Sequence, residues 1–294
     1  MGYAGPARRP NPSHAAIRPM PSAWSLPLSL VLELLALGLV AGFLAGLLGV
    51  GGGMMMVPIL TLVFDREGVP GDTGVKMAIA TSMATIMFTS LSSVRAHHRK
   101  GAVRWRVVAG MAPGILLGGL VGGAGVFAAV KGRALALVFA GFVGWSATQM
   151  LRSRKAAMPR PMPGVLGQSS AGAGIGLVSG LVGAGGGFLS VPFMTWGGVP
   201  IHQAIATSAA LGFPIAFANT IGYVVGGRHL PPALPGAFGF LYLPALAVIA
   251  CASVAMAPLG ARAAHAMDVA QLKRIFALLL YALGAYMLWR AVRG

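Results

Sequence analysis

The sequence predicts an all-α integral membrane protein with about eight transmembrane helices. Three observations predict this class: 56% of the 294 residues are hydrophobic, only 9% are charged, and the apolar residues gather in long runs. Soluble domains carry about 25% charged residues, so a soluble fold of this composition would lack polar surface. We expect two homologous four-helix repeats, each with a glycine-broken half-helix or re-entrant segment.

The chain begins with a segment that is expected to stay outside the membrane. Residues 1–27 are basic and rich in proline, so they are expected to form a disordered cytoplasmic tail. The apolar run 28–48 follows. It is longer than the about 7–15 residues of a signal-peptide core, and it is therefore interpreted as a retained first span.

Eight apolar runs approach the about 20 residues that a membrane crossing needs. They are 28–48, 75–95, 105–130 and 133–151 in a first repeat (28–151), and 164–183, 202–226, 237–260 and 271–290 in a second (164–294). A basic, proline-rich linker, 152–163, separates the repeats. The short segments 54–64 and 187–197 span only half a bilayer at about 1.5 Å per residue, and they are expected to be half-helices or re-entrant arms.

The distribution of Lys and Arg predicts the orientation. If the short segments do not cross the membrane, 15 of the 22 basic residues share a side with both termini; if they cross, the division is 10 to 12. The positive-inside rule favours the first arrangement. It predicts a multi-pass protein of the cell (inner) membrane with cytoplasmic termini and two halves in parallel orientation. Because the basic residues lie between apolar runs, the net charge of +17 does not indicate a nucleic-acid partner.

A glycine-rich block occurs twice in the chain. Residues 42–58 read GFLAGLLGVGGGMMMVP and residues 176–192 read GLVSGLVGAGGGFLSVP, with glycine at the same seven places. The sequence AIATS follows at 78–82 and again at 204–208. An internal repeat of this kind is typical of duplicated transporters whose helices break at the binding site.

The two glycine triplets are the leading candidates for a binding site. A helix that begins after such a break offers free backbone N–H groups and a positive dipole end, which attract an anion. The candidate substrate-binding residues are Gly51, Gly52, Gly53, Thr81, Ser82, Gly185, Gly186, Gly187, Thr207, Ser208 and Asn219. Each has a structural alternative: glycines can form hinges, hydroxyls can bond to their own helix, and an amide can join helices.

Several other polar residues have two interpretations. Lys76 aligns with His202 in the repeat, so both are expected at one depth near the outer interface. Lys76, His202 and Gln203 are candidates for anion attraction or proton coupling, and the alternative is an interfacial anchor. The pair His97–His98 is expected in a solvated loop. No metal site, cofactor or catalytic residue is predicted, since paired acids and nucleophile–base sets are missing from the sequence.

The doubled GxxGxGGGxxxVP block followed by AxATS resembles the TauE/SafE family of membrane permeases, the sulfite exporter group. The resemblance extends over nearly the whole chain from about residue 28. The matching positions are the two glycine triplets, Pro58, Pro192, Thr81–Ser82 and Thr207–Ser208. The long basic tail and a longer loop near 65–72 depart from the compact pattern of the family.

This resemblance implies a secondary transporter that moves sulfite or an organosulfur or sulfonate anion by alternating access. The alternatives are a permease of the same fold for another small anion, and a membrane sensor or assembly partner that transports nothing. The expected partners are a small anionic substrate and the lipid bilayer. The sequence leaves open the substrate, the direction of transport, the coupling ion and the oligomeric state.

Overall fold

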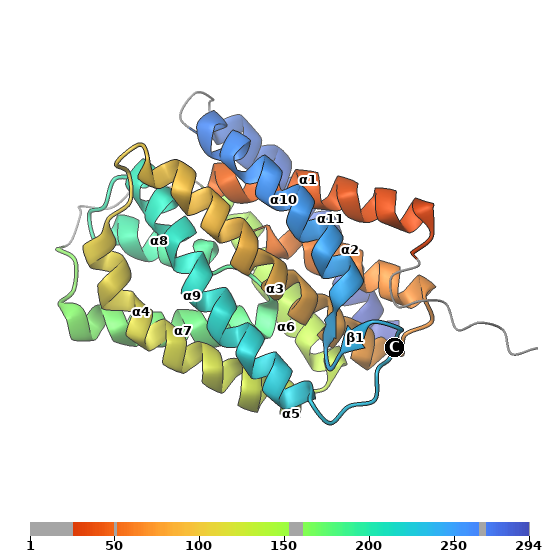
Figure 1. Cartoon of the computed structure of the whole chain (residues 1–294). Helices are drawn as coiled ribbons and strands as arrows, with labels where there is room; N and C mark the ends of the chain where they lie inside the picture. Colours follow the sequence, from red (N-terminus) through yellow and green to blue (C-terminus); the bar gives the residue numbers. More distant parts are fainter. Residues whose placement is uncertain (1–25, 50–51, 153–160, 265–268, 294) are drawn as a thin grey trace, which may run out of the picture.

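The computed structural model describes residues 26–49, 52–152, 161–264 and 269–293. In this part of the chain, eight helices are long and apolar enough to cross a membrane. They pack side by side as a bundle (Figure 1), which confirms the all-α membrane fold with eight spans. Most of the predicted N-terminal tail and most of the predicted linker lie outside the described residues.

The described helices follow the same order in the two halves of the chain. The first half contains α1 (Leu28–Leu48), α2 (Gly53–Arg66), α3 (Gly71–His98), α4 (Trp105–Leu120), the π-helix η2 (Val121–Val126), α5 (Phe127–Ala129) and α6 (Gly132–Leu151). The second contains α7 (Val165–Val182), α8 (Gly187–Trp196), α9 (Ile201–Gly227), the hairpin β1 (Ala237–Phe238) and β2 (Leu241–Tyr242), α10 (Leu243–Ala263) and α11 (Val269–Arg293). Helices α2 and α8 are the predicted short segments. Homology of the halves stays a prediction.

The contacts between helix ends define two ends of the bundle. At the Asp72 end, the Arg133 N–H donates to Asp72 Oδ1 over 2.8 Å, and Arg290 Nε donates to Asp65 Oδ2 over 2.8 Å. Helices α1, α3, α6 and α10 begin at this end, and α9 and α11 finish there. At the Arg104 end, Arg104 Nε donates to Gln203 Oε1 over 2.6 Å, which joins the end of α3 to the beginning of α9.

The central helices α3 and α9 run in opposite directions (Figure 1). Near the beginning of α3, Lys76 lies 5.9 Å from the centroid of the Phe127 ring, and that ring lies 4.3 Å from the ring of Tyr223 near the end of α9. At the other end, the Arg104 N–H just after α3 donates to Thr207 near the beginning of α9. The outer pair α6 and α11 is also antiparallel.

The predicted parallel orientation of the two halves is therefore wrong. The corresponding helices α3 and α9 would share a direction in parallel halves, and they do not. The reason lies in the short helices. Helix α1 runs away from the Asp72 end, and α2 returns to it, where Arg66 meets Glu33 of α1 at 3.4 Å. In each half, the glycine turn and the short helix together bring the chain back to the side on which that half began. The two halves are therefore inverted. The 15-to-7 division of basic residues assumed that the short segments do not return the chain, so it no longer applies.

Two helix pairs that join the halves pack closely through glycine. Helix α1 lies along α10, and α4 lies along α7 (Figure 1). A Cβ added at Gly46 would overlap the Ala257 carbonyl oxygen of α10, and one at Gly114 would overlap the Ser169 oxygen of α7. Small residues allow helix backbones to approach in lipid, where the hydrophobic effect does not drive helices together.

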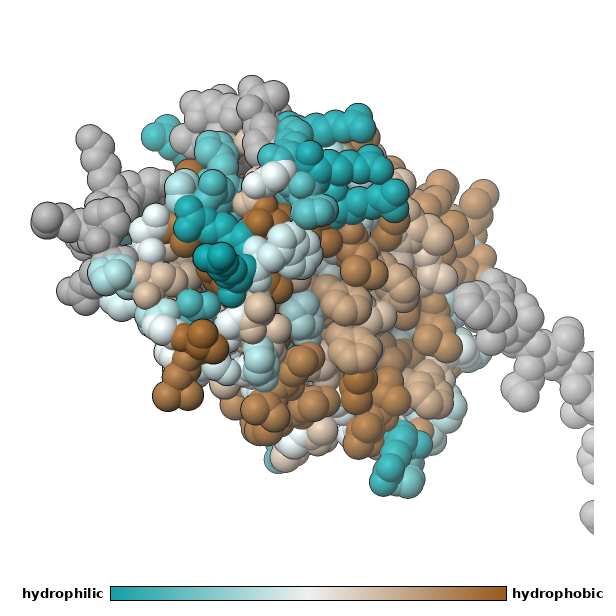
Figure 2. Space-filling model, turned by 60° about the vertical axis from the view of Figure 1, so that its left-hand side comes forward, coloured by the Kyte–Doolittle hydropathy of each residue, from teal (hydrophilic) through white to brown (hydrophobic). Residues whose placement is uncertain are grey.

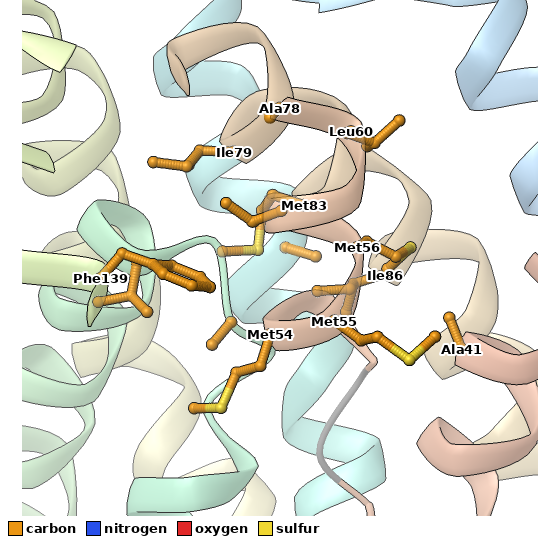
Figure 3. Close-up of a cluster of buried hydrophobic side chains, with 14 of the residues drawn as sticks. Ala41, Met54, Met55, Met56, Leu60, Ala78, Ile79, Met83, Ile86 and Phe139 are labelled. Carbon is orange, nitrogen blue, oxygen red and sulfur yellow. The ribbon is translucent and has the colours of Figure 1, made fainter. Parts of the chain in front are cut away.

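The interior and the outer surface both fit a membrane protein. Figure 3 shows the methionines at the start of α2 beside Ile79, Met83 and Ile86 of α3, with Met55 directed toward Ala41. On the face shown in Figure 2, apolar residues cover a broad area and hydrophilic residues gather in one part of it. Exposed apolar side chains such as Leu117, Val138 and Leu278 occur on several helices, as expected of a surface that contacts lipid tails.

Candidate functional site

The two glycine turns meet at the centre of the bundle. A Cβ at Gly53, the first residue of α2, would overlap the Gly183 carbonyl oxygen of the second turn. The first turn contacts α9, since Gly49 lies against Ile205. The second contacts α3, since a Cβ at Gly183 would lie 3.2 Å from Ile79 Cγ2. Each turn therefore packs against the long central helix of the other half.

Left-handed backbone at glycine shapes both turns. Gly52 has φ +69° and precedes α2, and Gly186 has φ +75° and precedes α8. Side chains other than glycine rarely adopt this conformation. The Met55 and Leu189 N–H groups donate to Gly52 O and Gly186 O, respectively, and the two N–H groups before each of them have no intrahelical acceptor. Of the predicted glycines, Gly51 lies outside the described residues.

A small cavity lies beside this crossing. Its volume is about 10 Å³, roughly the space that one water molecule needs. It is lined by Ala45, Gly49, Ser90, Ser93, Gly185, Ser208, Ala209 and Gly212, which come from α1, α3, α9 and both glycine turns. The lining contains three hydroxyl groups and no charged side chain. An oxyanion is larger than one water, so its binding requires the surrounding helices to separate.

The hydroxyls of the cavity differ in what they bind. Ser208 Oγ donates to Gly49 O over 2.8 Å and accepts from Ser190 Oγ over 2.9 Å, so it ties α9 to the first glycine turn. Ser90 Oγ donates to Met87 O of its own helix. Ser93 Oγ is buried and has no hydrogen-bond partner within the described residues. A buried unpaired hydroxyl costs about 1–3 kcal/mol, and among the cavity residues Ser93 is the one whose hydroxyl is available to a bound group.

The predicted threonines bond to the beginnings of other helices. Thr81 Oγ1 accepts from the Tyr242 N–H before α10 over 3.1 Å, and Thr207 Oγ1 accepts from the Arg104 N–H before α4 over 3.0 Å. The two contacts lie at opposite ends of the bundle. Burial, followed by the charge of Glu67, raises the pKa of the Tyr242 phenol. Neither threonine lines the cavity.

Ser82 and Asn219 also make protein contacts. Ser82 Oγ donates to Ile79 O in its own helix. Asn219 Nδ2 donates to Gly176 O over 3.2 Å and to Ile215 O over 2.8 Å. The first of these bonds joins α9 to α7, so the amide holds helices together in this structure. Ala45, Gly49, Gly185 and Ser208 are thus the residues of the two repeated motifs that line the cavity.

The basic residues of the repeat lie at opposite ends. Lys76 Nζ donates to Ala128 O over 3.0 Å and lies 5.4 Å from the centroid of the Phe240 ring, at the Asp72 end. His202 and Gln203 lie at the Arg104 end, where Gln203 accepts from Arg104. The expectation of one common depth for Lys76 and His202 is wrong, because α3 and α9 are antiparallel.

His97 also differs from its prediction. It was expected in a solvated loop with His98, but it is 1% exposed and its Nε2 lies 3.0 Å from Gly46 O of α1. His98 is exposed and accepts from Trp105 Nε1. Helix α3 continues for a turn beyond the predicted span and carries His97 into the contact with α1. Within the described residues no group of three metal-ligating side chains occurs.

Ser90, Ser93 and Gly212 also line the cavity, and the sequence did not predict them as site residues. The available signal was the spacing of hydroxyl residues along α3, where Thr85, Thr89 and Ser93 follow each other at intervals of four. This spacing places them on one helix face. Without knowledge of which face is buried, the pattern does not distinguish a ligand site from ordinary backbone bonding.

Comparisons with known proteins agree on the class of protein. The family profile described as "Sulfite exporter TauE/SafE" matches residues 34–287. A Haemophilus influenzae protein named "Probable membrane transporter protein" is 36% identical over 256 residues, which cover 85% of this chain and 95% of its own length. A Methanocaldococcus jannaschii relative of the same description is 29% identical and covers 73% of this chain and 84% of its own length. No solved structure matches.

The family profile extends across the glycine turns, the central helices and the outer helices that pack around them. The relatives are matched over most of their own length and are named as membrane transporters. The chain is therefore a membrane transporter protein, and it belongs to the TauE/SafE family.

Proposed function

We propose that this protein is a secondary permease that moves a small anion, sulfite or an organosulfur anion such as a sulfonate, across the membrane by alternating access. The observation that carries the proposal is the hydroxyl-lined cavity where the two glycine turns cross. Its position between inverted halves fits transporters that bind their substrate near the midplane at the interface of two repeats. The family description supports sulfur anions as the substrate class.

The chemistry of the lining favours an anion over a cation. No carboxylate lies among the cavity residues, and such groups are the usual partners of cations in membranes. The Ser93 hydroxyl and the first N–H groups of α2 and α8 supply hydrogen-bond donors, and each helix start adds about half a positive charge. A neutral donor set of this kind holds an oxyanion weakly enough to release it.

Alternating access requires a contact at each end of the bundle that can close the cavity on that side. Two hydrogen bonds are placed to do this. Thr81 bonds to the chain before α10 at the Asp72 end, and Thr207 bonds to the chain before α4 at the Arg104 end. Breaking one contact while keeping the other would open the cavity to one side only. We assign no catalytic residue, since the cavity offers no acid–base pair.

The proposed location is the cell (inner) membrane. Helix α1 begins and α11 finishes at the Asp72 end, so the termini share a side. Cytoplasmic termini remain a proposal, because the charge split that predicted them depended on parallel halves.

Counterflow of labelled sulfite into proteoliposomes tests the proposed function. Vesicles that contain the protein and unlabelled sulfite are expected to accumulate label in a saturable way, and methanesulfonate is expected to compete. Protein-free vesicles provide the background. Accumulation at the background rate, for sulfite and for labelled sulfonates alike, would contradict the proposal.

A further inference from the structure

One buried face of α3 carries polar side chains along most of the helix. The residues are Ser82, Thr85, Thr89, Ser93 and His97, and each is at most 1% exposed. Their spacing of three or four residues places them on a single face. Buried polar groups within a spanning helix are costly, and they are usually retained for a function.

The polar face passes through the cavity. Thr85 and Thr89 donate to carbonyl oxygens one turn earlier, and Thr89 also lies 2.6 Å from Ser253 Oγ of α10. Beyond them Ser93 lines the cavity without a hydrogen-bond partner in the described residues. His97 follows one turn later, between the cavity and the Arg104 end.

The antiparallel helix α9 provides a comparison within the same molecule. With the offset of 126 residues that relates the two AIATS motifs, the corresponding positions of α9 are Ser208, Leu211, Ile215, Asn219 and Tyr223. Tyr223 Oη donates to Gly180 O of α7, at the place where His97 meets Gly46 O of α1. Both helices thus have a polar side chain that meets a glycine carbonyl oxygen of a neighbouring helix, His97 on α3 and Tyr223 on α9. The middle of this face is apolar on α9, with Leu211 and Ile215, and polar on α3.

The difference between Ser93 and Asn219 accounts for the open space beside Ser93. Asn219 reaches the Gly176 carbonyl of the neighbouring helix and fills the space between α9 and α7. Serine is two heavy atoms shorter, so it leaves its hydroxyl unpaired and the space open. A transporter scaffold that needed only helix packing would be served by asparagine at both places.

We propose that the last part of this polar face, from Ser93 to His97, lines the path by which a small oxyanion moves between the central cavity and the Arg104 end, with Ser93 as its hydrogen-bond donor. This inference rests on the proposed function and adds the path to it. The distribution of charged side chains between the two ends of the bundle supports a path for an anion. Arg99, Lys100 and Arg106 are exposed at the Arg104 end, whereas the four carboxylates of the described residues, Glu33, Asp65, Glu67 and Asp72, lie at the other end.

Cysteine accessibility tests the path directly. Cys251 is the only cysteine of the chain, so Cys251→Ser provides a background without thiols. In that background Ser93→Cys is expected to react with a small, water-soluble thiosulfonate added from the side of the Arg104 end, and methanesulfonate is expected to slow the reaction. Ser146→Cys is the matched control, because Ser146 is equally buried but lies outside the cavity.

Two further variants distinguish a failure of the proposed path from a failure of the proposed transport function. Ser93→Asn is expected to fold, as Asn219 does in the other half, and to lose counterflow because the amide fills the cavity. Ser93→Ala is expected to raise the KM for sulfite about fivefold, the value of one hydrogen bond. If the wild type transports while Ser93→Cys reacts no faster than Ser146→Cys, and Ser93→Asn transports normally, the path is wrong although the proposed function stands. Background counterflow by the wild type would instead contradict the function itself.

Discussion

Ser208 joins three segments that are distant in the sequence. It bonds to Gly49 of the first glycine turn and to Ser190 of α8, and it lines the cavity from α9. The glycines of the two turns are needed for the backbone conformation and for close packing. Leucine at Gly52 or Gly186 would combine a left-handed φ with overlap of Ala41 O or Ile215. Loss of transport in such variants would therefore not separate binding from folding, and the hydroxyl residues provide the sharper tests.

Replacement of Thr81 by valine is expected to lower stability more than affinity. The change removes the acceptor of the buried Tyr242 N–H, and leaving a buried donor unpaired costs about 1–3 kcal/mol. The melting temperature of the purified protein should fall, while Thr81→Ser, which keeps the hydroxyl, should stay close to the wild type. A normal melting temperature for Thr81→Val together with a raised KM for sulfite would place the hydroxyl in the substrate site instead.

The short helices decide the architecture at the scale of secondary structure. Helices α2 and α8 are too short to span a bilayer alone, yet each brings the chain back to its starting side. Both begin deep in the bundle, after a turn that only glycine adopts readily. Between the halves, the long helices make their closest approaches at glycines of the α1–α10 and α4–α7 pairs.

Leucine at Gly46 is expected to disrupt the α1–α10 contact. A Cβ there would overlap the Ala257 carbonyl oxygen, and overpacking of a well-packed interface costs about 1–3 kcal/mol. The yield of folded protein in detergent and its melting temperature should both fall. Gly144→Leu is the control, since a Cβ at that position of α6 meets nothing within 4 Å. Equal behaviour of the two variants would contradict the packing described for α1 and α10.

The sequence predicts the helices better than it predicts their directions. Hydropathy locates all eight spans, because each must bury apolar surface in lipid. The direction of the second half depends on whether 54–64 and 187–197 return the chain across the bilayer, and their length alone does not decide this. For the candidate site, too, the sequence predicts one part and leaves another part unpredicted. Repetition identifies Gly185 and Ser208, whereas Ser93 contributes to the cavity through its difference from Asn219, which no shared motif reveals.

The whole molecule consists of two halves that pass through the bundle in opposite directions and meet at their glycine turns. Lys76 and His202, which align in sequence, consequently mark opposite ends. The inverted arrangement places the Thr81 contact with Tyr242 at one end of the bundle and the corresponding Thr207 contact with Arg104 at the other, on either side of the cavity. This is the geometry on which alternating access relies in transporters with inverted repeats.

Reporter fusions test the inverted arrangement. A reporter after Gly294 and one after Lys155 are expected to lie on opposite sides of the membrane, because α11 finishes at the Asp72 end and α6 finishes at the other. Fusions after Arg99 and Lys155 should agree with each other. In parallel halves the reporters after Lys155 and Gly294 would share a side, and that result would overturn the topology described above.

Equilibrium binding of labelled sulfite to the purified protein tests the central claim most directly, because binding in detergent needs no translocation. We predict saturable binding at one site per chain, competition by methanesulfonate, and an affinity about fivefold weaker in Ser93→Ala, as expected for one lost hydrogen bond from the unpaired hydroxyl of the cavity. Ser146→Ala, with an equally buried hydroxyl outside the cavity, should bind like the wild type. Equal affinities for Ser93→Ala and the wild type, or no saturable binding at all, would contradict an anion site at the crossing of the glycine turns.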